Sequence, residues 1–525
     1  MKKIKYYIAS ILLALSCGAC NDWLDVDPYD KMLEGKQYST EDNINSALNG
    51  LYRQMAGENL YGGQLSQTSL ELMAHYYVYA TNGVPGTAAP VPHYYFSIHE
   101  YGHGEIESRT GAIWTNAYKT LLNINNFIKG VNESKAIISA NHKNVLLGEA
   151  YALRAYIHFD LYRLFCPREP QATDKVLPYS ISPEATLNQA DYENKVYRTS
   201  AEFITLLKAD IQQAEQLLQA NDPILDPALE EDCISDNLQS DFYKNRNRRI
   251  NYYALMGLKA RVLQYTGDAT AAAAAAKVIT DKIEADQVFH WINPNNVETY
   301  KNYIFFSEVI FGVNNPDFRS RGTNYYGKTT FAGGAYAVNK KNLAKNIFAT
   351  YTEGNPDPSL GSIADVRIKQ WTEASILPDG TGTFVTDVAY VSHKYKVDAA
   401  SAEGYIPAVV DLQVLMRIPE MYYIQAEAAL DAGDTASAID LLNKVLAKRV
   451  TSSQYLLQPG TSATEIRDRI TGEYYREFSG EGQVFFYHKR LQSEKMFNGI
   501  AEGTNTISKS EYTVPIPKAE TDADF

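Results

Sequence analysis

Aromatic side chains in two Gly- and Asn-rich segments are the residues of this sequence best suited to binding chemistry. Aromatic rings stack on the flat C–H faces of sugars, while amide, carboxylate and guanidinium groups nearby bind hydroxyl groups. The residues in question lie outside any regular helical pattern, and long loops of this kind are usually functional or disordered. They are Tyr94 and Tyr95 in the segment 81–104, Tyr325 and Tyr326 in the segment 314–340, and Trp371, which follows in a polar context. We predict a ligand site on these loops; the alternative is that they only pack on the scaffold or on a protein partner.

The common signatures of catalytic and metal centres are missing from the sequence. There is no Gly-x-Ser-x-Gly elbow, Walker A loop, Rossmann fingerprint, His-Glu-x-x-His pair or D-x-D-x-D-G calcium loop. Cys166 and Cys233 have no spaced histidine partners, which argues against a cysteine-ligated zinc site. His158 lies on an apolar stretch and is expected to be a hydrogen-bonded core residue.

These observations predict a protein without a cofactor, a metal ion or an enzymatic activity. A glycosidase would need two carboxylates ~5–10 Å apart. This acidic chain has many candidates for such a pair, so the sequence neither excludes nor supports one. A glycoside hydrolase therefore remains the less favoured alternative.

Composition and charge restrict the class of partner. The chain has 525 residues, a formal net charge of −13 and a pI of about 5.3. Nucleic-acid binding needs basic patches, and the acidic balance argues against it. Tyrosine is plentiful, with 39 residues against 4 tryptophans, and its amphipathic ring suits wet binding faces as well as helix packing.

The N-terminus has the pattern of a secretory signal. Three lysines precede a short apolar run at 7–15, and small residues then lead to Cys17 and Cys20. The run is too short to span a bilayer, which takes ~20 residues. A cysteine after small residues is typical of a bacterial lipoprotein, and either cysteine fits; the alternative is a cleaved signal without a lipid.

The stretch 148–167 is the helix around which the scaffold is expected to form. It is apolar nearly all round, so it should be buried on most sides. Arg154, Asp160 and Arg163 are its charged exceptions, and we expect them to be paired. Pro167 ends the helix.

Further helical patterns surround this stretch. Those at 249–266 and 269–283 are separated by Gly267-Asp268, and those at 416–430 and 438–446 by a turn at Gly433-Asp434. A helix, a Gly-Asp turn and a second helix with small residues are typical of tetratricopeptide pairs. Thr199 or Ser200 is expected to cap a helix over 200–218, and residues 308–313 are expected to form a strand.

About eight dispersed motifs resemble those of the SusD/RagB family. The stretch 148–167 is similar to the family pattern EA-x-x-x-RA-x-x-x-F at Glu149, Arg154 and Phe159, although Cys166 replaces the usual Gly. The other matches are W-x-x-x-Y from Trp114, R-T-x-x-E from Arg198, S-E-x-I-F-x-V from Ser307, D-x-R from Asp365, K-Y from Lys394, the acidic E-G run from Glu473 to Arg490, and P-I-P from Pro515. Gln483 stands where the family usually has Arg, and the usual Asn-rich tail is missing.

The resemblance implies a mostly α-helical, SusD-like fold. Its parts would be a signal peptide (1–19), a lipidated tether (20–40), an N-terminal tetratricopeptide-like part (41–284), and a C-terminal part with loop insertions, short strands and a last helix pair (285–525). Residues 20–28 resemble the family's mature start, which favours Cys20 as the lipid anchor.

The resemblance also implies a function. Such a protein would be an outer-membrane lipoprotein at the cell surface that binds glycans and delivers them to a SusC-like TonB-dependent transporter. A peptide-binding lipoprotein of the RagB type is the alternative.

Overall fold

The structure is a computed structural model that describes most of the chain. The described residues are 36–75, 92–183, 196–226, 234, 242–285, 287–315, 317, 337–339, 343–348, 363–374, 389–395, 409, 411–497 and 504–521. The predicted lipid anchor Cys20 and the predicted ligand residues Tyr325 and Tyr326 lie outside these ranges, as does the side chain of Tyr94.

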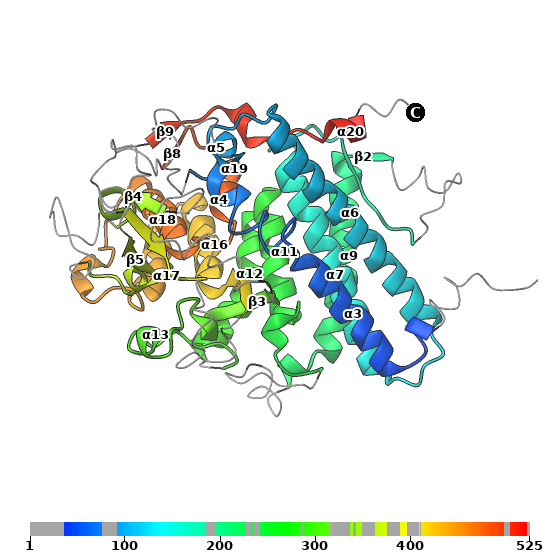
Figure 1. Ribbon diagram of the computed structural model, residues 1–525. Coiled ribbons are helices and arrows are strands. Elements are labelled where there is room, and N and C mark those ends of the chain that lie inside the picture. The colour runs from blue at the N-terminus through cyan, green and yellow to red at the C-terminus, as the bar shows by residue number, and fades with distance from the viewer. Residues whose placement is uncertain are drawn as a thin grey trace, which may run out of the picture.

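The scaffold is a row of helices in which each helix packs on the next along the chain (Figure 1). This arrangement confirms the predicted mostly α, tetratricopeptide-like fold, in which stacked helix pairs share a continuous core. The row comprises α3 (Glu41–Met55), α6 (Gly104–Glu133), α7 (Ala140–Phe165), α9 (Ser200–Asn221), α11 (Tyr252–Tyr265), α12 (Ala269–Glu284), α16 (Ile418–Asp431), α17 (Thr435–Leu446) and α18 (Ala463–Glu477).

The Gly-Asp turns separate the helices of each pair, as the sequence predicts. Gly267 and Gly433 adopt φ angles of +91° and +80°, which favour glycine because it has no Cβ. The aspartate that follows each glycine caps the next helix: Asp268 accepts a hydrogen bond from the backbone N–H of Ala271, and Asp434 accepts one from Ser437. One dipeptide thus ends a helix and starts its partner.

Helix α9 begins at a capping box. The Thr199 side chain accepts the Glu202 N–H at 3.2 Å, and the Glu202 carboxylate accepts the Thr199 N–H at 2.9 Å. Helix α7 is buried along nearly its whole length, as its all-round apolar pattern predicts. At Gly148 an added Cβ would lie 2.7 Å from Leu218, so glycine allows α9 to approach α7 closely.

Short strands occur in both halves of the chain, and most of those described lie in the second. The predicted strand is confirmed as β3 (Val309–Asn314), which pairs antiparallel with β7 (Leu412–Arg417), and β7 leads directly into α16. A three-stranded sheet has the order β4-β6-β5. The remaining strands are β4 (Ala337–Asn339), β5 (Trp371–Ala374), β6 (Ala389–Ser392), and the pairs β1 (Lys175–Pro178) with β2 (Tyr197–Thr199) and β8 (Lys495–Phe497) with β9 (Thr504–Thr506).

Short helices complete the fold. They are α4 (Ser69–Met73), α5 (Pro92–Ser97), α13 (Asn296–Thr299), α19 (Val484–Leu491) and α20 (Lys518–Thr521), with 3-10 turns such as η2 (Arg246–Arg248), η3 (Phe306–Glu308) and η7 (Val366–Gln370). The segment 81–104 therefore differs from the expected irregular loop, because it contains α5 and the first residue of α6.

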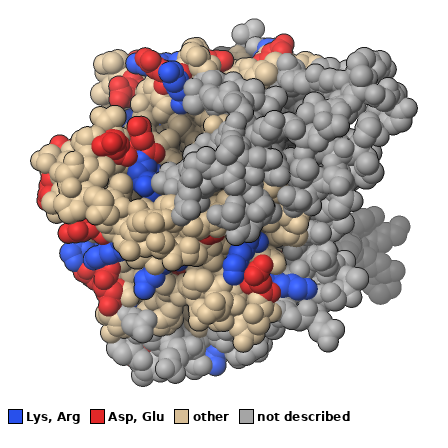
Figure 2. Space-filling view, turned by 90° about the vertical axis from the view of Figure 1, so that its left-hand side faces the viewer, with Lys and Arg blue, Asp and Glu red and all other residues tan. Residues whose placement is uncertain are grey.

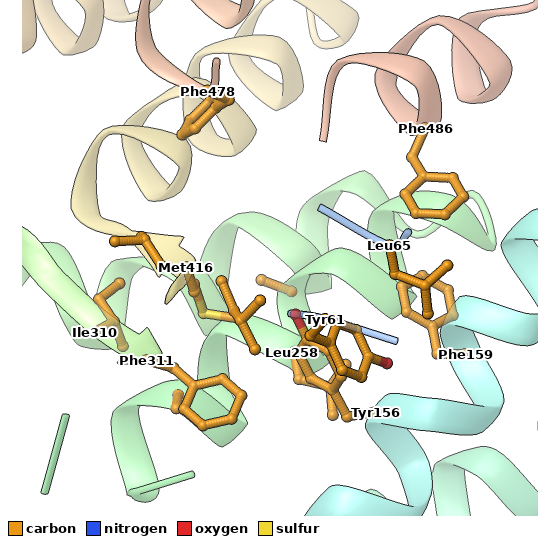
Figure 3. Close-up of a cluster of buried hydrophobic side chains, with 14 of the residues drawn as sticks. Tyr61, Leu65, Tyr156, Phe159, Leu258, Ile310, Phe311, Met416, Phe478 and Phe486 are labelled. Carbon is orange, nitrogen blue, oxygen red and sulfur yellow. The ribbon is translucent and has the colours of Figure 1, made fainter. Parts of the chain in front are cut away.

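One hydrophobic core joins the two halves (Figure 3). Tyr156 of α7 lies at its centre, with ring centroids 5.4 Å from Tyr61 and 5.6 Å from Phe311 of β3. Figure 3 places Met416 and Phe478, from the C-terminal half, in the same cluster. Helix α7, which the sequence predicts to be the centre of the scaffold, thus packs against both halves of the chain.

Candidate functional site

The charged residues of the family-like motifs meet in a cluster that we call the buried ionic centre. Its members are Glu308, Asp365, Arg367, Lys394, Arg417, Arg449, Glu473, Arg476, Glu477 and Glu481, and each is at most 4% exposed. Five are cationic and five are carboxylates, so the formal charges balance. The members come from η3, η7, β7, α18 and the segments beside them. The ionic centre therefore links elements that are far apart in the chain.

Glu477 contacts three of the arginine side chains in this centre. Its carboxylate accepts hydrogen bonds from Arg367 Nη1 at 3.0 Å, Arg417 Nη1 at 2.8 Å and Arg449 Nε at 2.5 Å. Burial alone would raise the pKa of Glu477, but the three guanidinium groups outweigh it and hold that pKa well below its usual range.

Glu473 behaves in the same way. Burial alone would raise its pKa, but Arg367 and Arg476 lower it to about 2. Carboxylates that are buried and always ionised near neutral pH are unsuited to general acid catalysis. The centre is a structural tie between elements distant in sequence, and its carboxylates are not a glycosidase pair.

A second set of contacts explains the motif Glu481-Gly482. Lys394 Nζ donates to the Glu477 carbonyl at 2.8 Å and to Glu481 Oε1 at 2.5 Å, and burial lowers the Lys394 pKa to about 8. Gly482, at φ +70°, donates its N–H to Glu71 Oε1 at 2.9 Å, and burial raises the Glu71 pKa to about 8. The motif thus anchors the short helix α4, which precedes the first aromatic segment.

The motif residues of α7 have a similar role. Glu149 pairs with Arg246 at 2.5 Å and accepts the hydroxyl of Tyr52 at 2.6 Å. Arg154 forms a bidentate pair with Asp210, at 2.8 and 2.6 Å. The expectation that the charges of this helix are paired is confirmed for Arg154 and also for Asp160 and Arg163, which pair with each other.

His158 is a hydrogen-bonded core residue, as expected. Its Nε2 accepts the Ser180 N–H at 3.0 Å, so its Nδ1 carries the proton and donates to the Arg154 carbonyl at 2.9 Å. Its ring stacks on Tyr179 at 3.8 Å, and burial lowers its pKa to about 3. A neutral imidazole with both nitrogens engaged has no free position for a metal or a proton-transfer role.

Tyr95 is the predicted ligand residue whose surroundings the structure describes best. It lies half-buried on α5, and its ring stacks on His103 with centroids 3.5 Å apart and planes inclined by 11°. His103 in turn caps α6, since its Nδ1 accepts the Glu105 N–H at 3.3 Å. One face of Tyr95 is therefore covered by a side chain that a long helix holds in place.

Trp371 does not lie as the sequence suggests. It opens β5, opposite Ser392 of β6, and is only 4% exposed within the hydrophobic core. Its ring consequently offers no open face to a ligand. Figure 1 shows α5 and β5 in separate parts of the molecule, so the structure does not bring Tyr95 and Trp371 into one platform.

A small polar cavity lies where α19 meets the helical row. It has room for only about one or two water molecules, which is too small for a sugar ring. Its lining comes from five helices and comprises Arg163, Arg261, Gln264, Tyr265, Glu420, Tyr474, Gln483, Phe486, Tyr487 and Arg490.

The surface charge and the metal-ligating residues of the described ranges complete the search for a site. On the face shown in Figure 2, positive and negative side chains of the described residues lie interspersed. Within the described ranges, no group of three or more His, Cys, Asp or Glu side chains could hold a metal ion. None of the helices in those ranges is long and apolar enough to cross a membrane.

Comparison with known proteins identifies the family. The SusD family model matches residues 232–524, more than half of the chain. The chain belongs to the SusD family. A second model of the same group, described as "starch-binding associating with outer membrane", matches residues 22–225.

Individual relatives of this SusD-family chain are distant. A "SusD-like protein P2" of Formosa agariphila is 26% identical over 164 residues, a match that spans 30% of that protein. A SusD superfamily protein of Bacteroides thetaiotaomicron has the same fold, with a TM-score of 0.65 at 20% identity over 92% of this chain and 98% of its own. A "SusD-like carbohydrate binding protein" of Bacteroides vulgatus aligns with a TM-score of 0.64 at 16% identity over 93% and 97% of the two chains.

Proposed function

We propose that this protein is an outer-membrane lipoprotein at the cell surface that binds oligosaccharides and delivers them to a SusC-like TonB-dependent transporter. The observation that carries the proposal is the family match across both parts of the chain, one of them to a model described as starch-binding. The relative from Bacteroides vulgatus, described as carbohydrate-binding, shares the fold over nearly the whole chain. The signal pattern ending at Cys20 supplies a means of attachment to the membrane.

We place the ligand site around Tyr94, Tyr95, Tyr325 and Tyr326. Support comes from Tyr95, which the His103 stack and the cap of α6 hold in one orientation. A ring held in this way loses little conformational freedom when a sugar stacks on it, and that favours binding. Trp371 is not part of this proposed site, because its ring is buried.

The proposed role is binding without catalysis. The carboxylates that the family-like motifs bring together are buried and paired with guanidinium groups. A single stacked ring contributes only ~1 kcal/mol beyond its buried area. We therefore expect weak intrinsic affinity, with capture strengthened when the protein and the transporter are held together.

A glycan array probed beside a peptide library, with the mature protein as the probe, tests this function. The proposal expects binding to one class of oligosaccharide and to no peptide. Incubation of each bound glycan with the protein should release no cleavage products. Peptide binding without glycan binding would favour a RagB-type role, and cleavage would identify a hydrolase.

A further inference from the structure

The turn between α6 and α7, residues 134–139, carries the most exposed large apolar side chain among the described residues. Ile137 is 99% exposed, whereas the other exposed large hydrophobic residues range from 41% to 45%. The turn lies at the end of a hairpin of two long helices, of 30 and 26 residues. At the end of the hairpin, this side chain would be among the first to touch a surface that the hairpin meets end-on.

Hydrogen bonds hold this turn in one conformation. Ser134 Oγ donates to the Tyr38 carbonyl at 2.6 Å and accepts the Ala136 N–H at 3.0 Å. Ser139 caps α7 by accepting the His142 N–H at 3.1 Å. Ala136 packs partly buried against the core on one side of Ile137. The exposure of Ile137 is therefore built into the turn and does not come from a frayed end.

The N-terminal tether joins the folded body beside this same turn. Tyr38 packs on Phe127 of α6 with ring centroids 6.2 Å apart, and Asn43 Nδ2 donates to the Lys36 carbonyl at 2.9 Å. Residues 21–35 separate Lys36 from Cys20. Such a length spans at most about 50 Å when fully extended and roughly 20 Å as a flexible coil. A lipid on Cys20 would keep the turn within that reach of the bilayer.

We infer that the α6–α7 turn rests on the outer membrane, with Ile137 among the lipid headgroups and upper acyl chains. This inference depends on the proposed lipid anchor at Cys20. Lys135 in the turn and Lys129 near the end of α6 are exposed, and their ammonium groups can reach lipid phosphates. Glu133 and Glu41 are exposed there too, so apolar contact contributes more than net charge.

The contact would fix the orientation of the protein relative to the membrane. Figure 1 shows the α6–α7 turn and the elements α5 and β5 at different ends of the molecule. With the turn on the membrane, α5 would lie at an end of the molecule away from the lipid surface. Attachment through one residue leaves a protein free to rotate, and a second contact removes that freedom.

A lipid-proximity measurement on the full lipidated protein tests the inference. An environment-sensitive fluorophore is attached at Ile137→Cys and, as a matched control, at Leu491→Cys, another exposed apolar residue, with Cys233 replaced by Ser in both. Each protein is reconstituted into phosphatidylethanolamine–phosphatidylglycerol vesicles that contain nitroxide-labelled lipid. We expect a blue-shifted emission at position 137 and quenching several-fold stronger than at position 491.

The outcomes separate the contact from the anchor. Equal, water-like emission at both positions, in protein that floats with the vesicles, would overturn the membrane contact and leave the proposed function intact. A shift at position 137 that needs the transporter would overturn it in favour of a protein contact. Protein that does not float would overturn the lipid anchor, and this inference with it.

Discussion

Replacing Glu477 by Gln should destabilise the protein strongly, because this carboxylate neutralises three buried guanidinium groups. The variant keeps the size of the side chain but removes one negative charge from a centre of five cations and five carboxylates, which leaves one buried positive charge in excess. Arg367, Arg417 and Arg449 each lose a charged partner at 3.0, 2.8 and 2.5 Å, respectively. Removing one partner of a buried ion pair typically costs about 3–5 kcal/mol.

The unfolding free energy measured in urea checks this value. Asp468→Asn is a matched control, since it removes a carboxylate from an exposed position of the same helix, and surface changes of this kind usually stay within about 0.5 kcal/mol. The loss in Glu477→Gln should persist at high salt, because buried charges are poorly screened. A Glu477→Gln protein within about 1 kcal/mol of the wild type would refute the view that this centre ties the fold together.

Because the pKa of Glu477 is lowered, the stability of the fold should decrease at acidic pH. A carboxyl group whose folded pKa lies below its unfolded value stabilises the fold above the unfolded pKa of about 4.3, and that stability is lost as the pH falls further. The wild type should therefore lose stability steeply below about pH 4. Glu477→Gln should show a shallower loss over the same range.

Five further variants test the anchor, the core and a buried histidine. Cys20→Ala should release the protein from the membrane fraction of cells that lack the transporter and Cys17→Ala should not, whereas retention of both would place the anchor elsewhere. Tyr156→Ala or Phe159→Ala should each cost about 3–5 kcal/mol, because both rings are 1% exposed, and an unchanged melting temperature would show that α7 is not the core. Burial lowers the pKa of His488 to about 3, and its ring nitrogens have no hydrogen-bond partner among the described residues. The neutral side chain therefore contributes its full stability above about pH 6.5 and progressively less as the pH falls toward 3. His488→Phe should weaken the acid dependence of the melting temperature between pH 7 and 4, and an identical dependence would contradict this assignment.

Local features of the fold could be predicted from the sequence because their determinants lie within a few residues. The Gly-Asp turns at Gly267 and Gly433 and the cap at Thr199 depend on φ angles and side-chain hydrogen bonds within one turn of helix. The burial of α7 followed from an apolar pattern that continues around the whole helix. These are the cases in which local propensity and tertiary structure agree.

Long-range pairings could not be predicted in the same way. Arg367 and Glu473 are 106 positions apart, and only the fold brings them within 2.5 Å. The resemblance to the family's motifs singled out these charged residues but did not show which of them pair. Trp371 was expected on a binding surface because its neighbours in sequence are polar, but strand pairing with β6 places it in the core. For Tyr95, the aromatic cluster was visible in the sequence, whereas its stack on His103 depends on how α5 meets α6.

Calorimetric titration of an oligosaccharide selected from the array, into the wild type and into Tyr95→Ala, tests the central claim most directly. Tyr95 is half-buried on a short helix outside the helical row, so its loss should leave the melting temperature nearly unchanged. The account predicts saturable binding by the wild type and binding at least tenfold weaker by the variant, a loss of about 1.4 kcal/mol or more. Equal affinity of the wild type and Tyr95→Ala for the oligosaccharide would contradict the account.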